Sequence, residues 1–461
     1  MKLNQQTRKI GLIISGLCVL SLTACEDSKE VVEVKTKVTA KGPTTGVLSD
    51  GFAISGVAYS TASGSSGVTD ANGVFHYQHG DNVRFKLGEL TLADIKGSAI
   101  VSPIDLAAGN ENKLRNLLIL LQSLDSDDDV TNGISISSKV ANAIKSSINL
   151  ESDPATFSDN TALKAAREAA ELPGEAKSLA EAGEQFLARG INLLSSHIWV
   201  KYDNQSASAL QIAEDGSGEY LHGEATADDS CDENRVCGGE TIFRTGVESG
   251  TTKAEAFDTR GFKLVGTTSI DTNLRAGLSH PRATWRINTD GDELIISDIV
   301  VAQRERQQSS LFGELFHIAK PIELSADDEP IATEVKERRY SKMDNAAQGI
   351  VGAWSLDKDT VKSKLFLFFP NNRFMLIDPT GQTVQSEPLA CGKPGIEFAA
   401  YSYDGASKAL KITSFIFDTN ACAGLSESAD KLVTFDISSD GNTATLTKQG
   451  QAAVKLSRVS N

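Results

Sequence analysis

The sequence predicts a mainly β protein with one helical segment, and two observations carry that prediction. First, short apolar runs alternate with turns rich in glycine, aspartate and asparagine, as antiparallel hairpins require. Second, apolar residues recur at three- and four-residue steps in one stretch only, between about residues 110 and 196, and this is the period of an amphipathic helix. We therefore expect a small N-terminal β-sandwich-like unit, an α-helical spacer and two homologous antiparallel β domains, each a barrel or a sandwich.

The length and charge of the chain limit the number of domains and the classes of partner. A chain of 461 residues is too long for one typical domain. It has 61 acidic against 45 basic residues, which gives a formal net charge of -16. This excess of negative charge disfavours nucleic acid and anionic lipid headgroups as partners.

The N-terminus has the pattern of an export signal. Positive charges precede an apolar run at residues 10–22 that is too short to span a bilayer. The run ends in Leu-Thr-Ala-Cys at residues 22–25, which resembles a bacterial lipobox. The resemblance implies that residues 1–24 are removed as a lipoprotein signal peptide and that Cys25 is lipidated. The glutamate after Cys25 favours the outer membrane, and residues 25–45 are polar and read as a tether.

Residues 46–106 are predicted to form a small β unit. Apolar and polar residues alternate on both sides of a turn at residues 70–73, within the stretch GVTDANGVFHY at residues 67–77. This stretch, with SPIDL at residues 102–106, resembles the carboxypeptidase-regulatory-like and Cna-B-like opening modules of bacterial lipoproteins and adhesin-like proteins. The resemblance implies an Ig-like module.

Residues 107–196 are predicted to be helical. A leucine stripe and a second stripe at four-residue steps each follow the helical period. The first stripe is Leu114, Leu117, Leu118, Leu121 and Leu124, and the second is Val140, Ile144 and Ile148.

An acidic cluster follows the leucine stripe. Asp125, Asp127 and Asp129 occupy alternating positions, as in the first half of an EF-hand loop. Val130 stands where that loop has glycine, and Ile136 stands where it has the bidentate glutamate. The cluster is therefore either a partial Ca²⁺ site or a solvated acidic helix end.

A nine-residue motif occurs twice in the C-terminal half. DTNLRAGLS at residues 271–279 and DTNACAGLS at residues 418–426 share seven of nine positions. Other landmarks keep the same order around it, beginning with Trp199 in one copy and Trp354 in the other. We infer two copies of one β domain at residues 197–325 and 350–461, joined by a linker at residues 326–349.

The motif itself is interpreted as a structural turn, because Asp and Asn side chains bond to nearby backbone. The alternative is a ligand-binding loop. Four cysteines remain after the signal and Cys25 are set aside, and an oxidising compartment favours disulfides. We expect Cys391 to pair with Cys422, which lies inside the second motif, and Cys231 to pair with Cys237.

The second copy opens with Gly-Ala-Trp at residues 352–354, which resembles the G-x-W opening of lipocalin-like barrels. The resemblance implies that the tryptophan closes the base of a barrel. The phenylalanine-rich runs that follow indicate either a filled core or a cavity for an apolar ligand.

No spacing of serine, histidine, cysteine or acidic residues points to a catalytic site, and Ca²⁺ is the one candidate cofactor. We expect a non-enzymatic, lipid-anchored envelope protein that binds another envelope or surface component, as an adhesin-like protein or a scaffold does. The alternative is a periplasmic lipocalin-like carrier of an apolar small molecule that works with an outer-membrane transporter.

Overall fold

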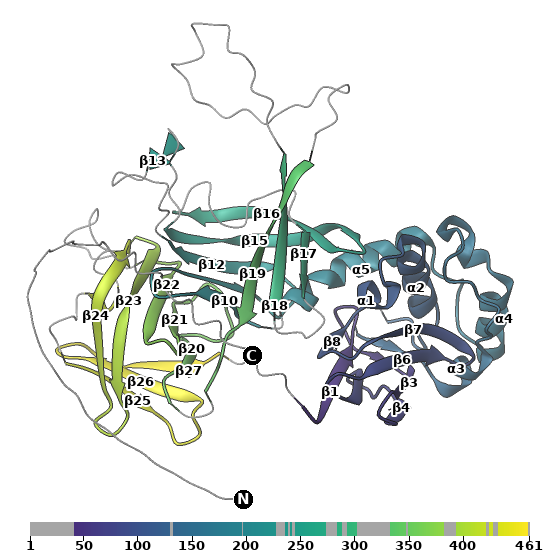
Figure 1. Ribbon diagram of the computed structural model, residues 1–461, viewed down its shortest axis with the longest axis horizontal. Coiled ribbons are helices and arrows are strands. Elements are labelled where there is room, and N and C mark those ends of the chain that lie inside the picture. Colours follow the sequence, from purple (N-terminus) through teal and green to yellow (C-terminus); the bar gives the residue numbers. More distant parts are fainter. Residues whose placement is uncertain are drawn as a thin grey trace, which may run out of the picture. The chain divides into compact units, whose positions relative to one another are not determined.

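A computed structural model gives the fold (Figure 1). The residues that it describes are 41–129, 132–195, 197–226, 236–237, 240–241, 245–272, 284–287, 293–301, 332–346, 349–381, 393–420, 424–426 and 432–459. The predicted signal peptide and most of the predicted tether lie outside this set.

The N-terminal part contains two small sheets. One is three-stranded, in the order β5 (Val74–Gln78), β1 (Pro43–Leu48) and β8 (Ile100–Val101). The other is four-stranded, in the order β4 (Ser66–Val68), β3 (Ala58–Thr61), β6 (Asn82–Leu87) and β7 (Leu90–Lys96). The chain is thus already in a strand at Pro43, inside the predicted tether.

The predicted helical segment contains most of the helices. They are α1 (Pro103–Ala107), α2 (Glu111–Ser123), α3 (Ser138–Ala143), a 3-10 helix (Pro154–Asp159), α4 (Thr161–Ala170) and α5 (Leu179–Leu194). Helix α3 ends before the second predicted stripe does. Its C-cap, Ile144, is extended and its carbonyl accepts the N–H of Glu89, so that Ile144 and Ile148 are buried from a loop and not from a helix.

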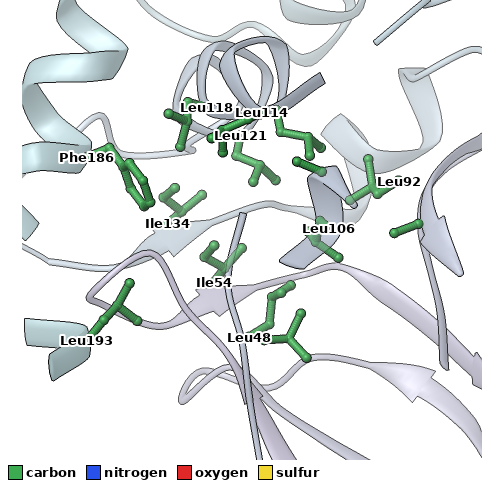
Figure 2. Packing of buried hydrophobic residues seen from close by; sticks show 14 of the residues in the cluster. Leu48, Ile54, Leu92, Leu106, Leu114, Leu118, Leu121, Ile134, Phe186 and Leu193 are labelled. Carbon is green, nitrogen blue, oxygen red and sulfur yellow. The ribbon is translucent and has the colours of Figure 1, made fainter. Parts of the chain in front are cut away.

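The helices share one hydrophobic core with the sheets. Figure 2 shows leucines of α2 above the strands, with Phe186 of α5 beside them. A short strand, β9 (Ile134–Ser135), pairs in parallel with β2 (Ile54–Ser55) and ties the two parts together. The helical segment therefore does more than separate the β units, because its apolar side chains complete their core.

The first C-terminal sheet closes into a barrel of eight antiparallel strands, called here the first barrel. Its strands are β10 (Trp199–Tyr202), β11 (Ala207–Ile212), β12 (Glu219–Ala225), β15 (Gly246–Asp258), β16 (Gly261–Asp271), β17 (Thr284–Ile287), β18 (Glu293–Val301) and β19 (Ala332–Lys342). Two short strands, β13 (Val236–Cys237) and β14 (Glu240–Thr241), pair separately. Closure removes the exposed edges that an open sheet would leave.

The last strand of the first barrel corrects the predicted linker. Strand β19 lies within residues 326–349 and pairs with both β18 and β10. Because acidic and basic residues make up much of this strand, its hydropathy did not predict a strand. Arg339 is half exposed, whereas Tyr340 is buried in the apolar core of the barrel, so the alternation of a half-buried strand is present.

The second barrel has the same strand order. Its strands are β20 (Gly352–Ser355), β21 (Leu365–Phe368), β22 (Arg373–Asp378), β23 (Gly395–Asp404), β24 (Ala409–Asp418), β25 (Val433–Ile437), β26 (Thr443–Lys448) and β27 (Val454–Arg458). Both opening tryptophans are fully buried. The indole N–H of Trp199 donates to the Leu194 carbonyl at 2.9 Å, and that of Trp354 donates to the Ile350 carbonyl at 2.8 Å.

A buried ion pair joins α5 to the N-terminal sheets. Arg189 Nη1 lies 2.8 Å from Asp50 Oδ2, and the two side chains are 3% and 1% exposed. Burial raises the pKa of Asp50, and the charge of Arg189 opposes that rise. Each partner therefore depends on the other to offset its loss of water.

Removing one partner of this pair is expected to cost more than removing both. Arg189→Met leaves the Asp50 carboxylate buried without its cation and should cost about 3–5 kcal/mol of unfolding free energy. Arg189→Met/Asp50→Leu should recover a large part of that loss. Urea unfolding followed by circular dichroism measures both. A double variant whose loss equals the sum of the two single losses would show that the pair is not coupled.

Candidate functional site

The predicted lipid and disulfide positions lie outside the part of the chain that the structure describes. This holds for Cys25, Cys231, Cys391 and Cys422; Cys237 falls in β13, but its side chain is not described. Lipidation of Cys25 and the two disulfides therefore stay predictions.

The three aspartates of the acidic cluster do not gather around a common point. Asp125 is buried and its Oδ1 accepts the N–H of Ser135 at 2.9 Å. Asp127 accepts from the backbone of Asp129 and from the side chain of Asn132. In the described residues no group of three or more metal-ligating side chains is arranged to hold an ion. The described structure therefore does not bring the three carboxylates together, and calcium binding by this cluster stays a prediction.

The repeated motif begins identically in both barrels. The N–H of Thr419 donates to the Ile396 carbonyl, and the Thr419 hydroxyl oxygen accepts the N–H of Ile396 at 2.9 Å. Thr272 does the same with Val247, whose N–H lies 2.8 Å from the threonine oxygen. The motif thus ties the end of one strand to the start of the neighbouring long strand.

In the second barrel the end of the motif folds onto a buried glutamate. Glu397 is 0% exposed, and its two oxygens accept the N–H groups of Leu425 at 2.8 Å and Ser426 at 3.0 Å. Gly424 permits this approach, because a Cβ there would lie 1.9 Å from Glu397 Oε1. Burial nevertheless raises the pKa of Glu397. The second motif therefore has a structural role, and residues 273–279 of the first motif lie outside the described part.

Strand register places the two barrels in correspondence. Glu397 lies opposite Leu376, and Glu248 of the first barrel lies opposite His222. Glu248 therefore occupies the position of Glu397, and it is 1% exposed.

The same register identifies the neighbouring positions. Two residues before His222 on β12 is Tyr220, and two before Leu376 on β22 is Phe374. On the last strand, Trp199 pairs with Lys342 and Trp354 pairs with Arg458. Tyr340 and Leu456 each lie two residues before these partners, so they occupy corresponding positions.

Aromatic and aliphatic side chains fill the interior of the second barrel. The ring centroid of Phe368 lies 5.1 Å from that of Phe374 and 5.4 Å from that of Phe435, and Trp354 packs edge-on against Phe435. All four side chains are fully buried. Of the two readings of the phenylalanine-rich runs, this packing matches the filled core.

The first barrel places polar groups at the corresponding interior positions. Tyr220 donates a hydrogen bond of 2.6 Å to Glu248 Oε1. His222 is 0% exposed, with its Nε2 2.9 Å from Ser208 Oγ, and Ser208 Oγ lies 3.3 Å from the Tyr340 hydroxyl. None of these residues was predicted from the sequence, because only the register reveals that polar groups replace apolar ones.

Burial also sets the charge state of these groups. It lowers the pKa of His222 to about 3, with a smaller contribution from the nearby Arg338, so the imidazole is neutral. His222 Nδ1 has no hydrogen-bond partner in the described residues. Burial and the bond to Glu248 raise the pKa of Tyr220, which stays a phenol.

A small cavity adjoins the Tyr220–Glu248 pair inside the first barrel. Its volume is about 30 Å³, which is enough to hold ordered water. It is lined by Leu210, Ile212, Tyr220, Glu248, Thr252, Leu264, Gly266, Thr268 and Trp285. Several polar groups therefore lie on the wall of this cavity, and we take this region as the candidate binding site.

A larger cavity of about 230 Å³ lies between α1, the end of α5 and the β15–β16 turn. Its polar side chains already have structural partners. Ser102 and Asp105 form the capping box of α1, and Thr259 bonds to Glu111. This cavity therefore has less to offer a polar ligand than the interior of the first barrel, despite its size.

The Ser208–His222 contact has the spacing of a nucleophile and its base. Such a base needs an orienting group on its second nitrogen, and Nδ1 of His222 has none in the described residues. The nearby carboxylate of Glu248 accepts from Tyr220 instead. The arrangement suits hydrogen-bonded recognition better than acyl transfer.

Comparison of the chain with protein-family models, curated proteins and solved structures gave no match. The resemblances noted in the sequence therefore stay predictions. Of the helices that the structure describes, none combines the length and the hydropathy that crossing a bilayer requires.

Gly424→Ala is expected to destabilise the second barrel. The new Cβ would overlap the Glu397 carboxylate and push the motif off it, at a cost of about 1–3 kcal/mol. Gly405→Ala is the matched control, because a Cβ there meets only a ring carbon of Tyr403 at 3.7 Å. Urea unfolding measures both, and equal effects of the two substitutions would contradict this account of the motif.

His222 should make stability depend on pH. Its pKa of about 3 in the folded state lies below the ordinary value near 6.5, so the unfolded chain binds the extra proton between these limits. Stability should therefore fall by about 1.4 kcal/mol per pH unit as pH decreases below 6.5. His222→Leu, which installs the residue type of the second barrel, should remove this component. If the unfolding free energies of wild type and variant changed with pH to the same extent, His222 would not be the source of this pH dependence.

Proposed function

We propose that this chain is a lipid-anchored, non-enzymatic binding protein of the cell envelope, and that the first barrel is its binding module. One observation carries the proposal. At corresponding interior positions the first barrel has Tyr220 and His222 where the second has Phe374 and Leu376.

The polar groups are not needed for the architecture. The second barrel reaches the same eight-strand closure with apolar side chains at those positions. Burying polar groups costs free energy even where each finds a partner, and more where one does not. Tyr220 and His222 carry this cost in the first barrel only, and binding of a ligand best explains why they are there.

The rest of the chain fits a protein held at a membrane. The predicted lipid on Cys25 and the polar tether would hold the folded part beside the membrane surface. The net charge of -16 disfavours nucleic acid. The partner that we propose is therefore another component of the envelope or of the cell surface.

The carrier of an apolar molecule draws less support. Such a carrier needs an apolar cavity, and the described side chains of the second barrel pack against one another in its interior. The cavity of the first barrel adjoins a buried carboxylate and hydroxyl groups.

The test converts the first barrel to the side chains of the second. The anchored chain is purified from membranes, and bound components are identified by native mass spectrometry and pull-down. Wild type should retain a component that Tyr220→Phe/His222→Leu loses while it stays folded. Tyr401→Phe is the control, because it deletes a buried hydroxyl of the second barrel and should leave binding unchanged. Retention by the double variant, or the absence of any retained component, would overturn the proposal.

A further inference from the structure

We infer that the two barrels pair as the two subunits of a symmetric dimer do, through the same outer face of each, and that side chains of unequal size make the other barrel of the same chain the partner of that face. The inference concerns the outside of the barrels, so it does not depend on the function proposed for the interior of the first. Its grounds are the apolar core between the barrels, the strand register and the contacts of the turns.

Apolar side chains that point out of both barrels form one buried cluster. This inter-barrel cluster includes Leu221 and Val247 of the first barrel and Met375 and Ile396 of the second. Leu221 and Met375 point outward, because their neighbours on both sides point into their barrels. Both are fully buried. An outward side chain without exposure is covered from outside, here by the other barrel.

Strand register shows that the two barrels contribute equivalent positions to this cluster. The register that aligns Glu248 with Glu397 aligns the strands on both sides of them, and the opening tryptophans align the first and last strands. The equivalent pairs in the cluster are Leu221 and Met375, Val247 and Ile396, Ile198 and Ala353, and Met343 and Val459. An interface that uses the same patch on both partners is isologous and has a two-fold axis.

The turns beside this face contact one another in both directions. Asn371, in the turn between β21 and β22, donates through Nδ2 to the carbonyl of Asp203, in the turn between β10 and β11, at 3.1 Å. Conversely, Lys362, between β20 and β21, forms an ion pair with Glu219, the first residue of β12. Strands β20 and β21 correspond to β10 and β11. The first turn of each barrel therefore meets the second turn of the other, as a two-fold axis requires.

One equivalent pair meets across the interface. Gly223 and Ile377 are equivalent, because they lie opposite Val247 and Ile396 in the register. A Cβ built on Gly223 would lie 2.5 Å from Cδ1 and Cγ1 of Ile377. Ile377 therefore packs on the backbone of Gly223, in space that only glycine leaves free, and contact between equivalent positions places this pair near the axis.

Other equivalent pairs also combine a small residue with a large one. They are Ala209 and Leu365, Ala213 and Phe369 and, with the sizes reversed between the barrels, Ile198 and Ala353. Pairing of like barrels from two chains would set Ile377 against Ile377, which is a collision, or Gly223 against Gly223, which is a void. The unequal sizes therefore favour the pair of unlike barrels that one chain supplies.

The first experiment exchanges the two side chains near the axis in the full chain. Gly223→Ile should lower the urea midpoint of unfolding because its side chain collides with Ile377, and Ile377→Gly should lower it because a void remains. Gly223→Ile/Ile377→Gly rebuilds the same pair in reverse and should recover at least half of the summed loss. Additive losses would overturn the inference.

The matched control changes a different isoleucine. Ile412 belongs to the interior cluster of the second barrel. The losses of Gly223→Ile/Ile412→Gly should therefore add, because the two sites share no contact across the interface. Recovery in this control as well would show that the recovery does not come from the Gly223–Ile377 pair, and would also overturn the inference.

A second measurement identifies the partner in the wild-type chain. Isotopically heavy and light chains are unfolded, mixed and refolded together, and a carbodiimide then joins lysines to carboxylates that they contact. Mass spectrometry should find Lys362 joined to Glu219 in peptide pairs that are all heavy or all light. Mixed pairs would show that another copy of the chain covers the face. The link between Lys408 and Asp436, within the second barrel, is the positive control. If only the control link forms, the barrels do not pair through this face.

Discussion

Each barrel buries a glutamate at the same place in its strand register, Glu248 in the first and Glu397 in the second, and each carboxylate needs hydrogen-bond donors there. Taking a carboxylate out of water costs several kcal/mol unless hydrogen bonds replace its solvation. In the second barrel, backbone N–H groups of the repeated motif supply them to Glu397. In the first barrel, the Tyr220 hydroxyl supplies one to Glu248. Among the described residues, backbone donors therefore meet the carboxylate of the second barrel, and a side-chain donor meets that of the first.

The interior positions beside the two glutamates differ between the barrels. In the second barrel they hold Phe374 and Leu376, which belong to its apolar interior. A tyrosine hydroxyl reaches Glu248 from inside the first barrel and brings polar surface with it. His222, directly opposite Glu248 in the register, extends that surface to Ser208. The cavity of the first barrel therefore has polar groups on its wall.

The sequence predicted the β class, the duplication and the burial of Trp354, because these depend on local periodicity, on landmarks kept in order and on the G-x-W pattern. Strand β19 was missed because charged residues occupy four successive positions, 336–339, and hide the alternation of the strand. Calcium binding stays a prediction, and the structure shows Asp127 capping its own loop, which spacing alone does not reveal. Glu248 was not predicted because one carboxylate among 61 acidic residues has no distinguishing sequence pattern. Its position opposite His222 in the strand register had to be known first.

The location of the polar site in the first barrel has a packing reason. The apolar end of that barrel continues into the core of the helices and N-terminal sheets, where the Phe262 ring centroid lies 5.0 Å from that of Phe186. The interior of the second barrel forms a cluster of its own. A barrel that shares a larger core gains stabilisation from outside its own wall, and this can offset the cost of polar groups inside it. The second barrel packs its outer wall against the first barrel, whereas its interior stays a separate apolar cluster.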